Sequence, residues 1–269
     1  MRSRGRAVRG HLPTPGRRGR WRRLGYPVLG VSTGLALWQA VVVGFGIRSF
    51  FLPAPTEVAA ALVGHAPYLG RATWVTLGHT LAGFGIAAAT GVVTALGLAA
   101  STPIRQAVLP VLVALQATPK VALAPLVIAW LGFGPASKIT LVALLSFFPV
   151  LLATLAGVTA TPVELIELAR SHRAPGWRIY LLIRIPWAAP QVCTGLQLGM
   201  SLALIGAVVA QITTPNAGLG AVIVRAGQFA DTPLAFAAII LLAGLGTGLF
   251  ALMTGIERWL LPWVRTING

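Results

Sequence analysis

Long apolar runs separated by short polar stretches dominate the chain. Six of these runs are long enough to cross a bilayer as helices, because a transmembrane helix needs roughly 20 mostly apolar residues and pairs its backbone polar groups internally. The pattern therefore predicts an all-α integral membrane protein with six transmembrane helices. The runs cover about residues 24–46, 74–100, 106–133, 138–160, 187–211 and 234–255.

The composition supports this class. The 269 residues are 56% hydrophobic and only 10% charged, whereas soluble domains average about 25% charged residues. The chain also contains 31 glycines, and small residues are frequent where helices pack closely in lipid. We therefore expect a membrane protein with several spans.

The basic residues are concentrated at the amino terminus. Nine of the 21 Lys and Arg residues are arginines within residues 1–23, a stretch too polar and too rich in glycine and proline to form a core. We expect a disordered cytoplasmic tail that touches anionic lipid, followed by a transmembrane domain over residues 24–269. A nucleic-acid arm is the alternative raised by the net charge of +16, but the position of the charge argues against a nucleic-acid partner.

The remaining basic residues predict the orientation of the spans. With the amino terminus inside, the inner segments hold 16 Lys and Arg residues and the outer segments hold four, among them Lys138. Cytoplasmic loops are the ones enriched in Lys and Arg. Both termini are therefore expected in the cytoplasm, together with the polar segment that joins spans four and five.

Little in the chain indicates chemistry of its own. All five acidic residues, Glu257 included, lie outside the predicted spans, whereas proton-coupled carriers usually have acidic or histidine relays within the membrane. Only His79 lies there. The sequence has no G-x-x-x-x-G-K-[S/T] phosphate loop, and its single cysteine gives no basis for a cysteine metal cluster. We expect no catalytic residue, metal site or bound cofactor, and energy that arrives from a partner.

A polar stretch, TPVELIELARSHRAPGWRIYLLIRIP (161–186), separates spans four and five. Thr161 is expected to be the N-cap of a helix, and Glu164, three residues later, completes a capping box. Gly176 can supply a turn, and a second short helix is expected at Trp177–Ile185. This helix, turn and helix could lie on lipid or dock to a protein, and spacing alone leaves both open.

The third predicted span contains a cation. Lys120 is expensive to bury in hydrocarbon, so we expect it to face a cavity, a carbonyl or an interface. Prolines interrupt the same span, and broken helices at membrane depth usually line cavities. Lys120 could add positive potential to an anion path, or it could bind helix carbonyls or snorkel to the inner surface. Gln116, Gln197 and Gln211 could likewise bind substrate or link helices.

The polar stretch also carries a family motif. Glu167, Leu168 and Ala169, followed by Ile183 and Pro186, resemble the "EAA" loop of ABC-transporter permease subunits of the binding-protein-dependent type. Further similarity to the nitrate, sulfonate and taurine permeases, and to those for pyrimidine precursors of thiamine, lies in the stretches FLPAPTEVAAAL (51–62), ATPKVALAPLVIAWLGFGPASK (117–138), SFFPVLLAT (146–154) and GLQLGMSLALIGAVVAQI (195–212).

The resemblance implies a type I ABC importer permease fold in a bacterial cytoplasmic (inner) membrane. It also implies an importer of a small solute, an anion such as nitrate, a sulfonate or taurine. Its other parts would be separate chains: ATPase subunits that bind ATP and Mg, an external substrate-binding protein, and a second permease copy that completes a homodimer. The glycines Gly218 and Gly220 would belong to the outer gate. The ATPase-docking residues would be Glu164, Glu167, Leu168, Ala169, Arg173, Gly176, Ile183 and Pro186.

Three residues depart from the family pattern. Leu168 replaces an alanine, a change that the family tolerates. Arg173 stands where the family has glycine, and we expect the turn to shift to Gly176. Gln211 stands where sulfonate-type permeases often have a glutamate, so no role of that acid is transferred to it. The competing classes are a secondary transporter or channel and a membrane enzyme.

Overall fold

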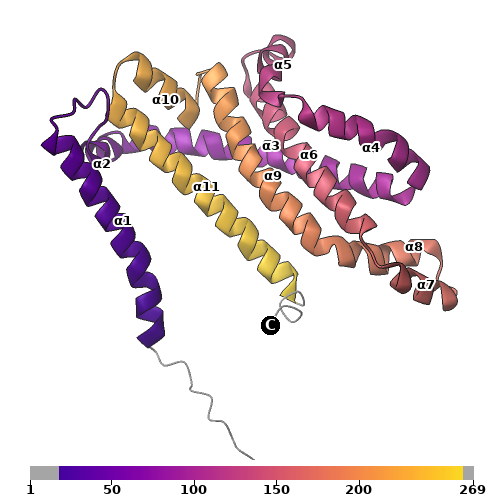
Figure 1. The fold of residues 1–269 in the computed structure, drawn as a ribbon. Coiled ribbons are helices and arrows are strands. Elements are labelled where there is room, and N and C mark those ends of the chain that lie inside the picture. Colours follow the sequence, from indigo (N-terminus) through magenta and orange to yellow (C-terminus); the bar gives the residue numbers. More distant parts are fainter. Residues whose placement is uncertain (1–17, 263–269) are drawn as a thin grey trace, which may run out of the picture.

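The computed structural model describes residues 18–262, and the described part of the chain consists of helices joined by loops, without strands (Figure 1). The elements are α1 (Arg18–Gly44), α2 (Pro55–Gly64), α3 (Ala66–Ala100), α4 (Thr102–Ala117), the 3-10 helix η1 (Lys120–Leu123), α5 (Ala124–Leu131), α6 (Pro135–Thr159), α7 (Val163–Ser171), α8 (Gly176–Ile179), the π-helical η2 (Tyr180–Arg184), α9 (Ile185–Thr213), α10 (Leu219–Gln228) and α11 (Thr232–Leu260).

Four helices are long and apolar enough to cross a membrane: α3, α6, the continuous helix over residues 176–213, and α11. A fifth crossing is possible if α4 and the η1–α5 pair count as one broken span, since they meet at a bend of 81°. The membrane class is thus confirmed, whereas six crossings stay a prediction. The expected first span falls on α1, whose apolar described part, Leu29–Gly44, is short for a crossing.

The expected amino-terminal tail lies mostly outside the described residues. Residues 1–17 are not described, and α1 already begins at Arg18. Helix therefore starts inside the stretch that was expected to be tail.

Helix α6 forms the centre of the bundle, between α3 and α9 (Figure 1). Glycines allow this close approach. A Cβ atom added to Gly195 of α9 would lie 2.6 Å from the Cβ of Ala153, and one added to Gly91 of α3 would lie 3.2 Å from the carbonyl oxygen of Phe147. Helices in lipid associate mainly through such van der Waals packing, because lipid tails are as apolar as the side chains.

The long helices run between two ends of the bundle, which we name after the short helices they carry. The α7 end holds Ala100, Thr159 and Ile185, and the α10 end holds the other ends of the same helices. At the α10 end, helices α2, α3, α10 and α11 share one apolar cluster. Its members include Val58, Leu69, Leu219, Val222 and Ala237, all buried.

Helix α2 is closed at its start by Glu57. The hydroxyl of Ser49 and the backbone N–H of Ala54 donate to the Glu57 carboxylate at 2.6 Å and 2.9 Å. These hydrogen bonds favour the charged form and hold the pKa of Glu57 below its ordinary value. The negative charge also suits the amino-terminal end of a helix.

We predict that Gly199→Ala destabilises the bundle by about 1–3 kcal/mol, as expected for overpacking. The added Cβ would lie 2.7 Å from Cγ2 of Val150 on α6, a β-branched side chain that cannot move aside easily. Gly97→Ala is the matched control, because a Cβ at Gly97 meets nothing within 4 Å. Thermal unfolding of both variants in detergent tests this; equal midpoints would contradict the packing argument.

Candidate functional site

The docking segment, residues 161–186, lies at the α7 end and consists of α7, a turn, α8 and η2. Helix α7 buries Ile166, which is 9% exposed, and leaves Leu168 58% exposed. Of the residues that the EAA resemblance selects, Ala169 and Ile183 are half-buried, whereas the exposed ones are Glu164, Glu167, Leu168, Arg173, Gly176 and Pro186. Most of this set is therefore accessible to a partner.

The predicted capping box at the start of α7 is wrong. The N-cap residue is Pro162, and no side chain caps the helix. The hydroxyl of Thr161 instead donates to the carbonyl of Val158 at 3.1 Å, where it satisfies a carbonyl near the end of α6. Glu164 remains in the first turn of α7, where its charge is favourable for the helix dipole.

The turn after α7 is made by Arg173, so the expected shift of the turn to Gly176 is wrong. Arg173 has a φ of 56°, in the left-handed region. Its N–H donates to the carbonyl of Arg170 at 2.8 Å, and the N–H of Ala174 donates to that of Ala169 at 3.0 Å. These two bonds form a Schellman motif, whose left-handed position is usually glycine. Gly176 instead opens α8 as an ordinary helical residue.

The expected separate helix at Trp177–Ile185 is also wrong. The chain runs without interruption from Gly176 to Thr213. Pro186 has no N–H and disfavours α geometry in the preceding turn, and the N–H of Ile185 bonds to the carbonyl of Tyr180, five residues back. The resulting π turn keeps the helix continuous. Any displacement of α8 therefore passes directly into α9.

A second connection joins the docking segment to α3. The hydroxyl of Tyr180 donates to the backbone carbonyl of Leu96, close to the end of α3. Leu96, Tyr180 and Val192 also pack against the buried cluster that α3, α6 and α9 form at this end. The segment is thus attached to two of the long helices.

Lys120 lies at the break between α4 and α5. Its ammonium donates to the carbonyl of Gln116 at 2.8 Å and lies 4.7 Å from the ring centre of Phe148. Phe148 is midway along α6, which places Lys120 near the middle of the bundle's depth. The cation closes the carboxyl end of α4, where helix carbonyls lack partners. This is the contact with helix carbonyls that the sequence left as one alternative.

Gln211 is fully buried and joins three elements at the α10 end. Its side-chain oxygen accepts from the hydroxyl of Thr76 and from the N–H of Gly220, both at 3.0 Å. Gly218 has a φ of 101°, and a Cβ there would collide with the Gln211 carboxamide. The two glycines expected in the gate therefore lie directly against the Gln211 side chain. Position 218 requires glycine, because its backbone is left-handed and no room is left for a Cβ atom.

Gln197 is paired within the bundle. Its side-chain amide donates to the carboxylate of Glu257 at 2.6 Å, which links α9 to α11. The sequence placed Glu257 outside the last span, but α11 continues to Leu260. The pair satisfies two polar groups that would be costly if they faced lipid.

Sequence reasoning missed Lys138. It was assigned to an outer segment, yet it is 3% exposed in the first turn of α6. The spacing of residues in the sequence could have predicted this burial. Lys138 lies on the same face of α6 as Leu141, Val142 and Leu145, all of which are buried.

Comparison with known proteins identifies the family. A family model described as "Binding-protein-dependent transport system inner membrane component" matches residues 83–265. The chain belongs to this family. It is therefore an ABC-transporter permease component of the inner membrane and not itself an enzyme, as the sequence predicted.

Curated relatives match along most of their length. The chain is 37% identical to the riboflavin transport system permease protein RibX of Chloroflexus aurantiacus, covering 90% of this chain and 91% of the relative. It is 31% identical to the formylaminopyrimidine transport permease protein ThiX of Halalkalibacterium halodurans, covering 85% and 92%. It is 29% identical to the taurine transport system permease protein TauC of Escherichia coli, covering 85% and 86%.

We predict that Arg173→Gly stabilises the carboxyl end of α7 by about 1 kcal/mol, because glycine adopts the left-handed conformation without the steric cost of a Cβ. Gly176→Ala is the matched control and should be tolerated, since its Cβ meets nothing within 4 Å. Hydrogen exchange of the α7 amides measures both. Faster amide exchange in Gly176→Ala, with no slowing of exchange in Arg173→Gly, would show that the left-handed turn is at residue 176 and not at residue 173.

Proposed function

We propose that the chain is the membrane subunit of an ATP-driven importer that carries a small solute from an external binding protein to the cytoplasm. Family membership supports this role, and the lack of a phosphate loop assigns ATP and Mg to separate ATPase subunits. Two copies of the chain, six spans each, form the type I permease with both termini in the cytoplasm. The arginine distribution supports this orientation.

The docking segment is the contact for the ATPase in this proposal, and its continuity with α9 is the observation that carries the argument. Exposed Glu164, Glu167 and Leu168 offer charged and apolar contacts together. Closure of the ATPase pair displaces α7, and the uninterrupted helix over residues 176–213 carries the displacement to the α10 end. ATP acts through its preference for one of two arrangements of the whole subunit.

We predict that Glu167→Lys weakens association with the ATPase subunit by about tenfold or more, since it reverses a charge at the centre of the exposed contact. Co-purification of the ATPase with the tagged chain measures the loss. Arg48→Glu is the control, because it reverses an equally exposed charge at the α10 end. Normal assembly of Glu167→Lys with its ATPase would count against the docking role.

For the substrate, we propose a small sulfonate, with taurine, whose sulfonate group is negatively charged, as the representative. The likeness to the taurine permease TauC supports this, and so does the position of Lys120 at the broken span near the middle of the bundle's depth. The second candidate is a heterocycle such as riboflavin or formylaminopyrimidine, which the likeness to RibX and ThiX favours.

We predict that Lys120→Met lowers ATP-dependent taurine uptake several-fold and leaves riboflavin uptake, if present, unchanged, because only taurine carries a sulfonate group that the positive charge of Lys120 attracts. Lys120→Arg keeps the charge and should retain most of the uptake. Proteoliposomes that contain the ATPase and the binding protein allow both solutes to be measured. Unaltered taurine uptake in Lys120→Met would show that Lys120 does not contribute to the translocation path.

A further inference from the structure

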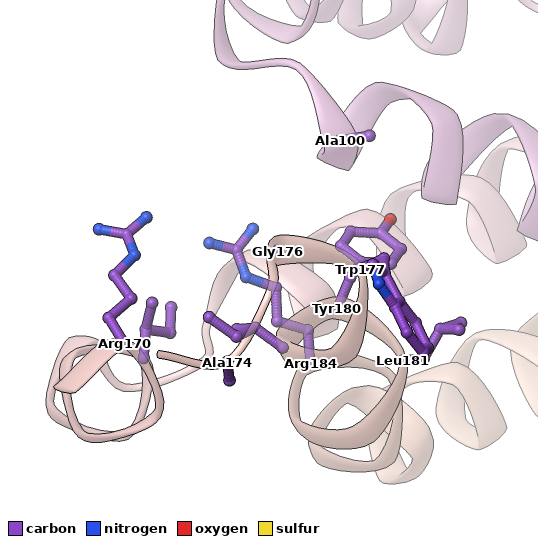
Figure 2. A pocket seen from close by; sticks show the side chains of 10 residues that line it. Ala100, Arg170, Ala174, Gly176, Trp177, Tyr180, Leu181 and Arg184 are labelled. Carbon is purple, nitrogen blue, oxygen red and sulfur yellow. The ribbon is translucent and has the colours of Figure 1, made fainter. Parts of the chain in front are cut away.

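A pocket of about 640 Å³ lies at the α7 end, beside the docking segment. Two arginines line it, Arg170 from α7 and Arg184 from η2, together with Trp177 and Tyr180. Figure 2 shows both guanidinium groups extending to the same side of the segment. No acidic side chain of the described residues belongs to the lining. The pocket is thus basic, with an aromatic and apolar wall.

The pocket and the exposed docking surface occupy different faces of α7. Ile166 and Arg170, four residues apart, lie on one face of the helix and both line the pocket. Glu164 and Leu168 are each two residues from Ile166, which places them on the opposite face. A partner that covers the exposed face therefore leaves the pocket face toward the long helices.

The position of the pocket matches the level of lipid headgroups. Ala100, the last residue of the spanning helix α3, forms part of its wall, and Arg184 directly precedes α9. Trp177 and Leu181 are 60% and 51% exposed, so apolar surface surrounds the basic opening. Tryptophan is enriched at the membrane interface, and basic pockets at the ends of spans bind anionic headgroups.

We propose that Arg170 and Arg184 together bind the phosphate of an anionic phospholipid, with the acyl chains along the exposed apolar surface beside Trp177 and Leu181. Guanidinium groups suit this task, because their planar array of N–H donors matches phosphate oxygens. The bound lipid would fix the distance between α7 and the end of α3. This proposal concerns lipid binding by the chain alone and does not rest on the ATPase contact.

The test measures lipid retention by the purified full-length chain, using native mass spectrometry with phosphatidylglycerol or phosphatidylcholine added after delipidation. We expect phosphatidylglycerol to be retained preferentially and the Arg170→Gln, Arg184→Gln double variant to bind it about 30-fold more weakly. Arg178→Gln is the matched control, because the Arg178 guanidinium stacks 5.2 Å from the Trp177 ring and does not line the pocket. It should bind like the wild type.

Several outcomes would overturn the proposal. These are equal retention of both lipids, an equal loss in Arg178→Gln, or unchanged binding in the double variant. Displacement of the lipid by millimolar inorganic phosphate would identify a free anion as the ligand. Loss of ATPase co-purification with lipid binding intact would assign the pocket to the ATPase. The single variant Arg170→Gln repeats the test without a risk of misfolding, since Arg170 is exposed on the surface of α7, and it should also weaken phosphatidylglycerol binding.

Discussion

The close contact of α6 with α3 and α9 is the constraint on which the rest of the structure depends. In lipid the hydrophobic effect does not drive helices together, so the bundle relies on dense packing and on paired polar groups. Glycines at the crossing points, such as Gly91, Gly195 and Gly199, bring the backbones within reach of each other. This packing keeps α3 and α9 against α6, and both helices then extend to the two ends where contacts with partners are proposed.

The two ends are connected by the same helices. At the α7 end, α9 continues into η2 and α8, and the hydroxyl of Tyr180 bonds to the carbonyl of Leu96 on α3. At the α10 end, Gln211 of α9 bonds to Thr76 of α3 and to the turn before α10. A relative movement of α3 and α9 would therefore change both ends together, which is what transmission across the membrane requires.

Polar groups at membrane depth are satisfied mainly by neighbours within the bundle. Lys120 bonds to the carbonyl of Gln116 at the helix break, and Gln197 bonds to Glu257 between two helices. Buried hydroxyls such as those of Thr80 and Ser146 donate to the backbone carbonyl four residues back. An unpaired polar group in hydrocarbon costs several kcal/mol, so these contacts stabilise the fold whatever further role each residue has.

The sequence by itself determined the membrane class, a helix along most of α3, α6 and α11, and a short helix that ends before a turn within 161–186, because apolar run length and local helix and turn residues are sufficient for these. Only the tertiary structure decided how the segments join. Thr161 bonds to Val158 instead of capping α7, Arg173 adopts the left-handed turn, and α8 merges with α9. It also enclosed Gln211 in the Gly218–Gly220 turn. These outcomes depend on which groups from distant parts of the chain come within bonding distance, and local pattern carries no information about that.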